Sequence, residues 1–312
     1  MEIPRFGVAL SEPSAGQVLG RIQRAEELGV KAVWLTTGLG SDALSIFAGA
    51  AATTRHVIMG TAIVPTFPRH PLVMAQQAAD IASIAPGRLV LGIGPSHGPA
   101  MTGRYGIPYA KPLEHLREYV AVLRAALNEG TVDFTGERYS VHAATVKAEV
   151  PIIISALRAQ SYSLGGEIAD GAVAWICPAP YLREVARPAM ERGAAQAGRA
   201  VPPMIAHAFL CVSEDREAML QAVPSVLGRY PTTPNYQAMF DAAGYPEARE
   251  GKWSAAMLEA VVLQGDEAAV TRQVASFMAT SGAQAIILSV LPVGPDRTAA
   301  TERALRCVAA MG

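Results

Sequence analysis

One stretch of the chain, residues 57–97, constrains the fold more than any other because it reads as strand, loop, helix and strand in succession. Val57–Val64 is a short β-rich apolar run, and Pro65 after it disfavours continued ladder pairing. A helix is predicted over 71–85, followed by a second buried strand at Leu89–Ile93. Two strands that are apolar throughout imply parallel pairing, with both faces of the sheet covered.

The alternation of strand and helix patterns continues along the 312 residues. Helical patterns stand between or after the strands at 18–28, 42–54, 71–85, 115–127 and 298–310. The predicted strands are Phe6–Leu10, Ala32–Leu35, Val57–Val64, Leu89–Ile93, Pro151–Ser155, Ala172–Ile176, Met204–Val212 and Ala285–Val290. This alternation predicts an α/β fold, a (β/α)8 TIM barrel with insertions and with both termini on one rim. A doubly wound sheet is the competing fold, but its glycine-rich phosphate loop needs a third glycine where this chain has His97.

We expect residues 1–312 to form a single domain that carries two insertions. Residues 130–149 have turn residues between aromatic positions, which indicates a small hairpin. Residues 229–253 are rich in proline, tyrosine and charge, and long insertions in compact domains are often lids.

Composition excludes several classes of function. The 26 basic and 27 acidic residues balance, and no basic run or interleaved aromatic cluster favours nucleic acid. No apolar run approaches the roughly 20 residues of a membrane span, and no signal peptide is evident. The three cysteines lie far apart and form no disulfide framework. A cytoplasmic protein is expected, with a small molecule as its partner.

The predicted strand ends carry few side chains that could act as acids, bases or nucleophiles. Most are apolar or hydroxylic, which suits a flat conjugated ring better than a metal or a sugar polyanion. The six histidines have no metal-binding spacing, no lysine falls at a strand end, and no G-x-S-x-G motif is present. The difficult chemistry is therefore expected to belong to a cofactor.

Several motifs carry a resemblance to a known family. They are Gly60-Thr61, Arg69-His70-Pro71, residues 87–94 (GRLVLGIG), 133–137 (DFTGE), 166–171 (GEIADG) and 265–267 (GDE). Together they resemble the bacterial luciferase-like superfamily, and within it the oxidoreductases that use the deazaflavin coenzyme F-420. The resemblance covers most of the chain and also implies a barrel.

The resemblance implies a cofactor site at the carboxyl ends of the strands. The positions of Ala62 and Ile63 match a bulge with a non-proline cis peptide that backs the deazaflavin ring. Thr36, Ser96 and His97 are expected to contribute to the same site. Where relatives have Asp-His after the second strand, this chain has Thr36-Thr37, so their proton-handling machinery is only partly present.

A second part of the predicted cofactor site is the loop after the fifth strand, which opens a helix. Its members are Ser155, Ala156, Leu157, Arg158, Ala159 and Gln160. Free N–H groups at a helix start bind anions, and a phosphate would turn the unfavourable dipole interaction of Arg158 into attraction. Arg158 pointing into solvent is the alternative. Arg69 and His70 would either bind the acidic tail of the cofactor or cap the barrel rim.

His97 is the predicted catalytic residue, because imidazole titrates near neutrality and can pass a proton as a hydride moves. A purely positional role for His97 is the alternative. Tyr105, Trp175 and Tyr236 are predicted to line the substrate pocket, although loop packing would also account for the tyrosines.

These expectations define an oxidoreductase that transfers a hydride between coenzyme F-420 and a small organic substrate, by reduction of C=C or C=N or by oxidation of an alcohol. One alternative is an FMN-dependent luciferase-like monooxygenase. The other is a barrel that binds a cofactor or ligand without catalysis. No metal is predicted, and a homodimer is expected.

Overall fold

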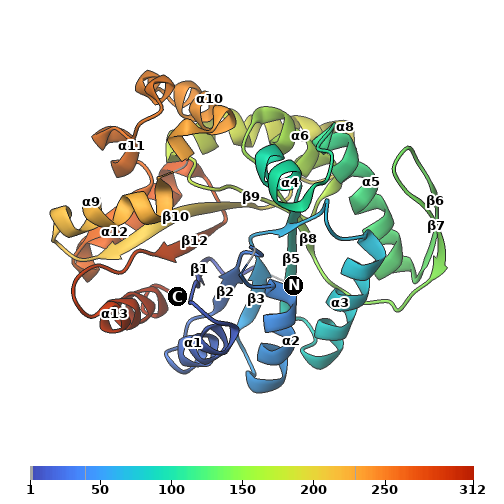
Figure 1. Ribbon diagram of the computed structural model, residues 1–312, viewed down its shortest axis with the longest axis horizontal. Helices are drawn as coiled ribbons and strands as arrows, with labels where there is room; N and C mark the ends of the chain where they lie inside the picture. The colour runs from blue at the N-terminus through green and yellow to red at the C-terminus, as the bar shows by residue number, and fades with distance from the viewer. Residues whose placement is uncertain (1–2, 39, 229) are drawn as a thin grey trace.

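The computed structural model describes residues 3–38, 40–228 and 230–312, and its centre is a closed barrel of eight parallel strands (Figure 1). In ring order they are β1 (Phe6–Ala9), β2 (Ala32–Leu35), β3 (Ile58–Thr61), β5 (Leu89–Gly94), β8 (Ile152–Ser155), β9 (Gly171–Val173), β10 (Met204–Val212) and β12 (Ala285–Val290), which pairs with β1 again. The predicted (β/α)8 barrel is confirmed, with all eight predicted strands in its wall.

Helices surround the barrel, and several begin at side-chain caps such as Ser14, Asp42 and Asp266. The α-helices are α1 (Ala15–Glu27), α2 (Ala43–Thr53), α3 (Pro71–Ile84), α4 (Gly98–Tyr105), α5 (Pro112–Arg124), α6 (Ala159–Ile168), α7 (Ala179–Tyr181), α8 (Arg187–Gln196), α9 (Arg216–Leu227), α10 (Pro234–Ala242), α11 (Ala255–Glu259), α12 (Glu267–Ser281) and α13 (Arg297–Ala309). Shorter helical turns are η1 (Ala125–Glu129), η2 (Leu182–Ala186), η3 (Tyr230–Thr232) and η4 (Pro246–Glu250). No helix in the described ranges is long and apolar enough to cross a membrane.

The barrel interior is filled by side chains, with Trp34 at its centre. A Cβ added to Gly7 or to Gly60 would collide with the Trp34 ring, so these two glycines leave the space that the indole occupies. Val90 and Ile287 belong to the same buried cluster. The barrel interior is therefore closely packed, and a ligand can bind only at the rim where the strands end.

Two local corrections concern strand ends. The predicted strand at Val57–Val64 is interrupted after Thr61, and the chain resumes pairing as β4 (Val64–Pro65). Pro65 was expected to end the pairing; instead it is opposite Gly94, which is possible because a two-residue strand needs no N–H from it. The predicted strand at Ala172–Ile176 ends early as β9, and Ile176 has a positive φ of 47°.

The structure also has a strand that was not predicted, β11 (Val262–Gly265). It pairs with the second half of β10, whereas β9 pairs with the first half. The insertion at 130–149 contains the antiparallel strands β6 (Thr131–Thr135) and β7 (Ser140–Ala144), outside the barrel beside α5 (Figure 1).

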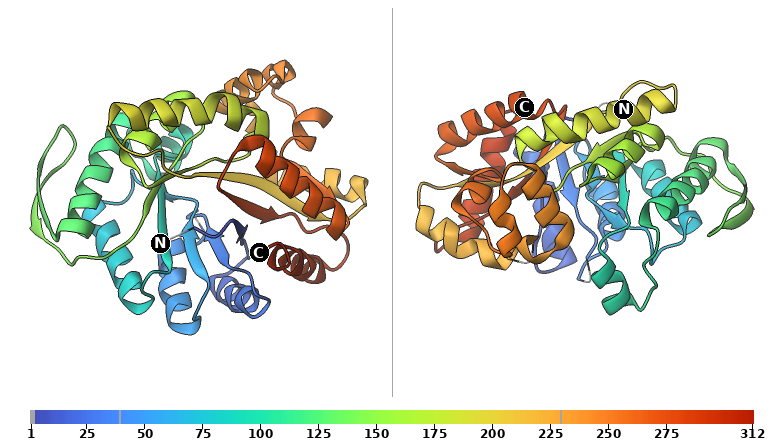
Figure 2. Two further views of the ribbon diagram at one scale, coloured as in Figure 1. Left: turned by 180° about the vertical axis from the view of Figure 1, so that it is seen from behind. Right: turned by 90° about the horizontal axis from the view of Figure 1, so that it is seen from above.

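The predicted lid at 229–253 holds η3, α10 and η4, and its first residue lies outside the described residues. Tyr236, Met239 and Phe240 on α10 are buried. Whether this segment moves stays a prediction. The C-terminus lies on the side of the barrel opposite α4 and α10 (Figure 2, right). Gly312 lies beside Phe6 at the start of β1, so the two ends of the described chain lie on one rim, as predicted.

Candidate active site

The end of β3 forms a bulge at the barrel mouth, and the Ala62–Ile63 peptide bond in it is cis, as the resemblance implied. The Thr61 hydroxyl replaces ladder pairing there: it donates to the Gly92 carbonyl at 2.6 Å and accepts from the Gly92 N–H at 2.7 Å. A Cβ on Gly92 would collide with the Thr61 carbonyl oxygen, so this close approach requires glycine.

The loop after β2 holds both residues of this bulge. The Thr36 hydroxyl donates to the Ala62 carbonyl at 2.6 Å, and the Thr37 N–H donates to the Ile63 carbonyl at 3.1 Å. The two threonines therefore position the strand end, and their hydroxyls are neither acids nor bases near neutral pH.

The end of β5 is free of side chains on its inner side. A Cβ on Gly94 would collide with the Ser155 hydroxyl and crowd Ile63, as one on Gly92 would crowd Thr61. At both glycines the position of a Cβ is already taken by a neighbouring atom, the Thr61 carbonyl oxygen or the Ser155 hydroxyl, so the glycines let the bulge and Ser155 lie close to the end of β5. Ala62, Ile63 and Ser155 thus offer apolar and hydroxyl contacts, which fit the chemistry of a flat deazaflavin or flavin ring.

The loop from Ser155 to Gln160 leads into α6, as predicted, but part of its anion-binding capacity is already used. The Ser161 hydroxyl accepts from the N–H groups of Leu157 at 3.0 Å and Arg158 at 3.1 Å. Ala156 donates its N–H to the Val173 carbonyl. The first turn of α6, at Ala159 and Gln160, is the part left for a phosphate, with the exposed Arg158 side chain beside it.

His97 is exposed at the start of α4, one residue after Ser96, whose φ is 59°. Its ring lies 5.8 Å from the ring of Tyr236 on α10, measured between centroids. Burial raises the pKa of Tyr236 well above its usual value, so its hydroxyl stays protonated near neutral pH. The structure therefore brings together a predicted catalytic residue and a predicted pocket residue from segments far apart in sequence.

Trp175 is held by two contacts that the sequence did not reveal. Its indole N–H donates to the Tyr230 hydroxyl at 2.7 Å, which ties the lid segment to the mouth. Its ring stacks on His207 at 3.7 Å between centroids, with 19° between the planes. The ring of Tyr230 in turn contacts that of Tyr236 at 4.7 Å.

His207 is fully buried in the barrel wall. Burial lowers its pKa to about 3, so the ring is neutral. It accepts from the Ile176 N–H at Nδ1 and is 2.8 Å from the Ser289 hydroxyl at Nε2, which therefore carries the proton. The signal for this residue was present in the sequence, since it is the one histidine within the otherwise apolar strand Met204–Val212.

Tyr105 lies in a different place from the other two predicted pocket residues. It lines a rim recess of about 280 Å³ together with Thr37, Asp42 and Arg69. Arg69 pairs with Asp42 at this rim, and His70 caps α3 by accepting from the Leu72 N–H. Binding of the acidic tail of the cofactor by either residue stays a prediction.

The Asp42–Arg69 pair is partly buried, at 27% and 20% side-chain exposure. Burial opposes ionisation of Asp42, but hydrogen bonds from Arg69 and Ser45 prevail and lower the pKa of its carboxyl. The Nη1 atom of Arg69 is buried with no partner in the described part of the chain. The recess is therefore lined by an ion pair without net charge. No group of three potential metal ligands occurs among the described residues.

Comparison with known proteins agrees with this architecture. Residues 4–285 match the family model of the luciferase-like monooxygenases. An F-420-dependent glucose-6-phosphate dehydrogenase from Microbacterium testaceum is 33% identical over 221 residues, which are 64% of this chain and 65% of the relative.

Two solved structures share the fold. An F-420-dependent secondary alcohol dehydrogenase in complex with an F-420–acetone adduct superposes with a TM-score of 0.84 at 18% identity and covers 99% of both chains. The FMN-bound oxygenating constituent of 3,6-diketocamphane monooxygenase from Pseudomonas putida gives 0.75 at 16% identity, over 98% of this chain and 96% of the other. The chain belongs to the luciferase-like monooxygenase family. It is an oxidoreductase.

Proposed function

We propose that the protein uses coenzyme F-420 to exchange a hydride with a small organic substrate. The observation that carries this proposal is the grouping of the apolar bulge at Ala62 and Ile63 with the Ser155 hydroxyl around the end of β5, beside the start of α6. This grouping offers apolar and hydroxyl contacts for a flat ring, with an anion-binding helix start next to them. The named F-420-dependent relatives support the same cofactor.

Ala62, Ile63 and Ser155 would border the ring, and the first turn of α6 with Arg158 would hold the phosphate. When bound, the deazaflavin supplies or accepts a hydride. Oxidation of an alcohol releases one proton from its hydroxyl, and reduction of C=C or C=N consumes one. His97 would hold that proton, because it is the ionisable side chain at the end of β5.

The residues that line the rim recess indicate the charge of the substrate. Arg69 is already neutralised by Asp42, so the recess has no charge to offer to a phosphate. The hydroxyl-bearing residues that line it, Thr37, Ser41 and Tyr105, suit a neutral hydroxyl or carbonyl oxygen instead. We therefore propose an uncharged, oxygen-bearing substrate in place of a sugar phosphate.

Anaerobic turnover tests this function. Oxidised deazaflavin is mixed with enzyme and either 2-propanol, cyclohexanol or glucose 6-phosphate, and reduced deazaflavin with cyclohexenone or a cyclic imine. We expect absorbance changes with a neutral substrate in one direction and none with glucose 6-phosphate. Product formation that requires FMN and oxygen would contradict the proposal and support a monooxygenase. A cytoplasmic homodimer also stays a prediction, to be tested by fractionation and sedimentation.

A further inference from the structure

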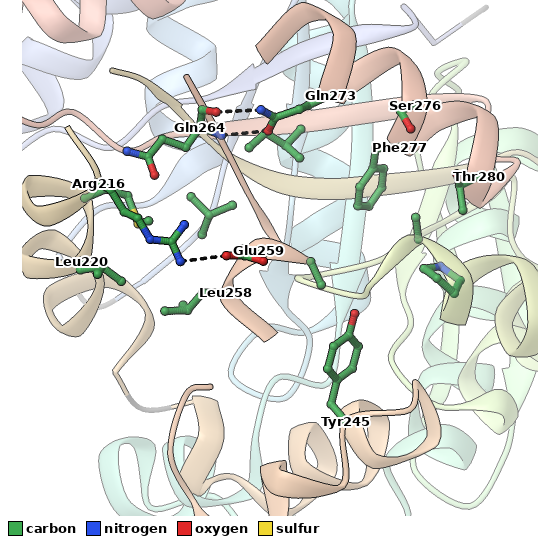
Figure 3. Close-up of a pocket in the computed structure, with 16 residues that line it drawn as sticks. Arg216, Leu220, Tyr245, Leu258, Glu259, Gln264, Gln273, Ser276, Phe277 and Thr280 are labelled. Atoms are coloured by element: carbon green, nitrogen blue, oxygen red, sulfur yellow. Dashed lines mark hydrogen bonds and ion pairs between the residues drawn. The ribbon is translucent and has the colours of Figure 1, made fainter. Parts of the chain in front are cut away.

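The outer edge of β11 faces a hollow of about 490 Å³ that lies outside the barrel wall (Figure 3). β11 pairs with β10 on one side and, within the described residues, with no strand on the other. The walls of the hollow come from β11, α9, α11 and α12. The peptide groups on a strand edge without a partner strand must find hydrogen-bond partners elsewhere, and on this edge they face the hollow.

The direction of those peptide groups follows from the hydrogen bond between Phe209 N–H and the Val261 carbonyl, at 2.8 Å. Parallel pairing alternates, so Val261 and Leu263 turn their peptide groups toward β10. Val262 and Gln264 then turn theirs outward, into the hollow.

At Gln264 a side chain takes the place of the missing strand. The Gln273 carboxamide on α12 accepts from the Gln264 N–H at 3.0 Å and donates to the Gln264 carbonyl at 2.7 Å (Figure 3). One carboxamide thus satisfies one outward peptide group completely.

Val262, one step earlier on the same edge, has no equivalent side chain among the described residues. It is only 5% exposed. The Nε2 atom of the Gln264 side chain is also buried without a partner. The outward peptide group of Val262 is therefore available to form hydrogen bonds with a molecule bound in the hollow.

The remaining walls limit the chemistry of that molecule. Figure 3 shows the rings of Tyr245 and Phe277 entering the hollow from opposite sides. The charged residues among those that line it are Arg216 and Glu259, and they pair at 2.8 Å. The lining therefore carries no net charge and much apolar surface, and its volume falls within the roughly 300–1,000 Å³ of small-molecule sites.

We propose that this hollow is a second binding site, for an uncharged small molecule with a carboxamide on an apolar or aromatic body. The carboxamide would pair with the outward peptide group of Val262, as Gln273 pairs with that of Gln264. The site is separate from the barrel mouth, and its occupation needs no cofactor.

Ligand-observed NMR with three matched probes tests the proposal on the full chain. Benzamide offers both N–H and carbonyl, methyl benzoate lacks the N–H, and benzoate carries a charge. We expect benzamide to bind at millimolar concentration and methyl benzoate to bind about fivefold more weakly, as the loss of one hydrogen bond implies. Benzoate should not bind, because the lining has no unpaired cation for it.

Two variants place the binding in this hollow. Ser276→Trp on the exposed face of α12 would fill the hollow and abolish benzamide binding. Ala275→Trp, at an exposed neighbouring position that does not line it, is the matched control and should bind normally. Absence of benzamide binding, equal affinity for the three probes, or binding that survives Ser276→Trp would each overturn the proposal. None of these outcomes depends on hydride transfer.

Discussion

The Thr36 hydroxyl donates a 2.6 Å hydrogen bond to the carbonyl of Ala62, which joins the loop after β2 to the bulge that ends β3. Thr36 itself is exposed, so its main contribution is to fix the position of the bulge. We expect Thr36→Val, which keeps the shape and removes the hydroxyl, to weaken deazaflavin binding about three- to tenfold, the value of one hydrogen bond. Thr36→Ser restores the donor and should restore affinity. Equal dissociation constants for the three proteins would show that the bulge does not depend on this bond.

His97 is expected to act in proton transfer and not in cofactor binding. We predict that His97→Ala binds deazaflavin normally and loses about 10²–10⁴-fold in kcat, the usual contribution of a general acid or base. The matched control is His142→Ala, which changes an exposed histidine on β7 in the outer hairpin. Pre-steady-state kinetics and cofactor titration separate the two effects. A normal kcat with weakened binding would assign His97 a positional role.

The start of α6 is expected to bind phosphate through Arg158 and the first-turn N–H groups. Arg158→Gln should weaken binding of coenzyme F-420 about tenfold, as charge-assisted hydrogen bonds to phosphate imply. The same change should leave binding of a ribityl deazaflavin without phosphate unaltered. Equal losses for the two ligands would mean that Arg158 acts on the loop and not on the phosphate.

Two buried histidines predict how stability depends on pH. Burial lowers the pKa of His207 to about 3 and that of His115 to about 4, and Arg138 contributes to the second shift. Below the ordinary histidine pKa of about 6.5, the two imidazoles are protonated in the unfolded chain but stay neutral in the folded protein. The free energy of unfolding therefore falls as the pH drops. Few carboxylates titrate between about pH 6 and 5. In this range each histidine should lower the free energy of unfolding by up to about 1.4 kcal/mol for each pH unit of acidification.

Urea unfolding at several pH values between 6 and 5 measures how steeply the free energy of unfolding changes with pH. His207→Gln and His115→Gln should each reduce this slope, even where they lower stability at pH 7. Phe209→Leu, a change in the same buried strand without a titratable group, should lower stability and leave the slope unchanged. A slope that neither histidine variant alters would contradict this account.

The lid prediction depends on the bond between Trp175 and Tyr230. Tyr230→Phe removes the acceptor for the indole N–H and should raise hydrogen exchange in residues 230–253 relative to the barrel strands. Addition of cofactor and substrate should lower exchange in the wild-type segment. Unchanged exchange in both experiments would mean that the segment is a fixed part of the rim.

The sequence was sufficient for the barrel because strands such as Leu89–Ile93 and Met204–Val212 are apolar on both faces and are separated by helical periodicity. It was insufficient for β11, since Val262–Gly265 is too short to show a period and pairs only along half of β10. Local motifs placed the bulge at Ala62.

The rest of the site depends on contacts between distant loops, which leave no local signature. The pairing of Asp42 with Arg69 spans 27 residues, and that of Trp175 with Tyr230 spans 55. Tyr105 looked equivalent to Tyr236 in sequence, but α4 carries it to the rim recess on the side of α2. Aromatic character alone does not indicate on which side of a barrel mouth a loop will close.

The identity of the cofactor is the central claim, and parallel titration of the purified protein with coenzyme F-420 and with FMN tests it most directly. Fluorescence quenching reports binding of each ligand. We predict micromolar affinity for coenzyme F-420, with FMN bound at least tenfold more weakly. Selective micromolar binding of FMN would contradict the account, and weak binding of both ligands would indicate a barrel without this redox role.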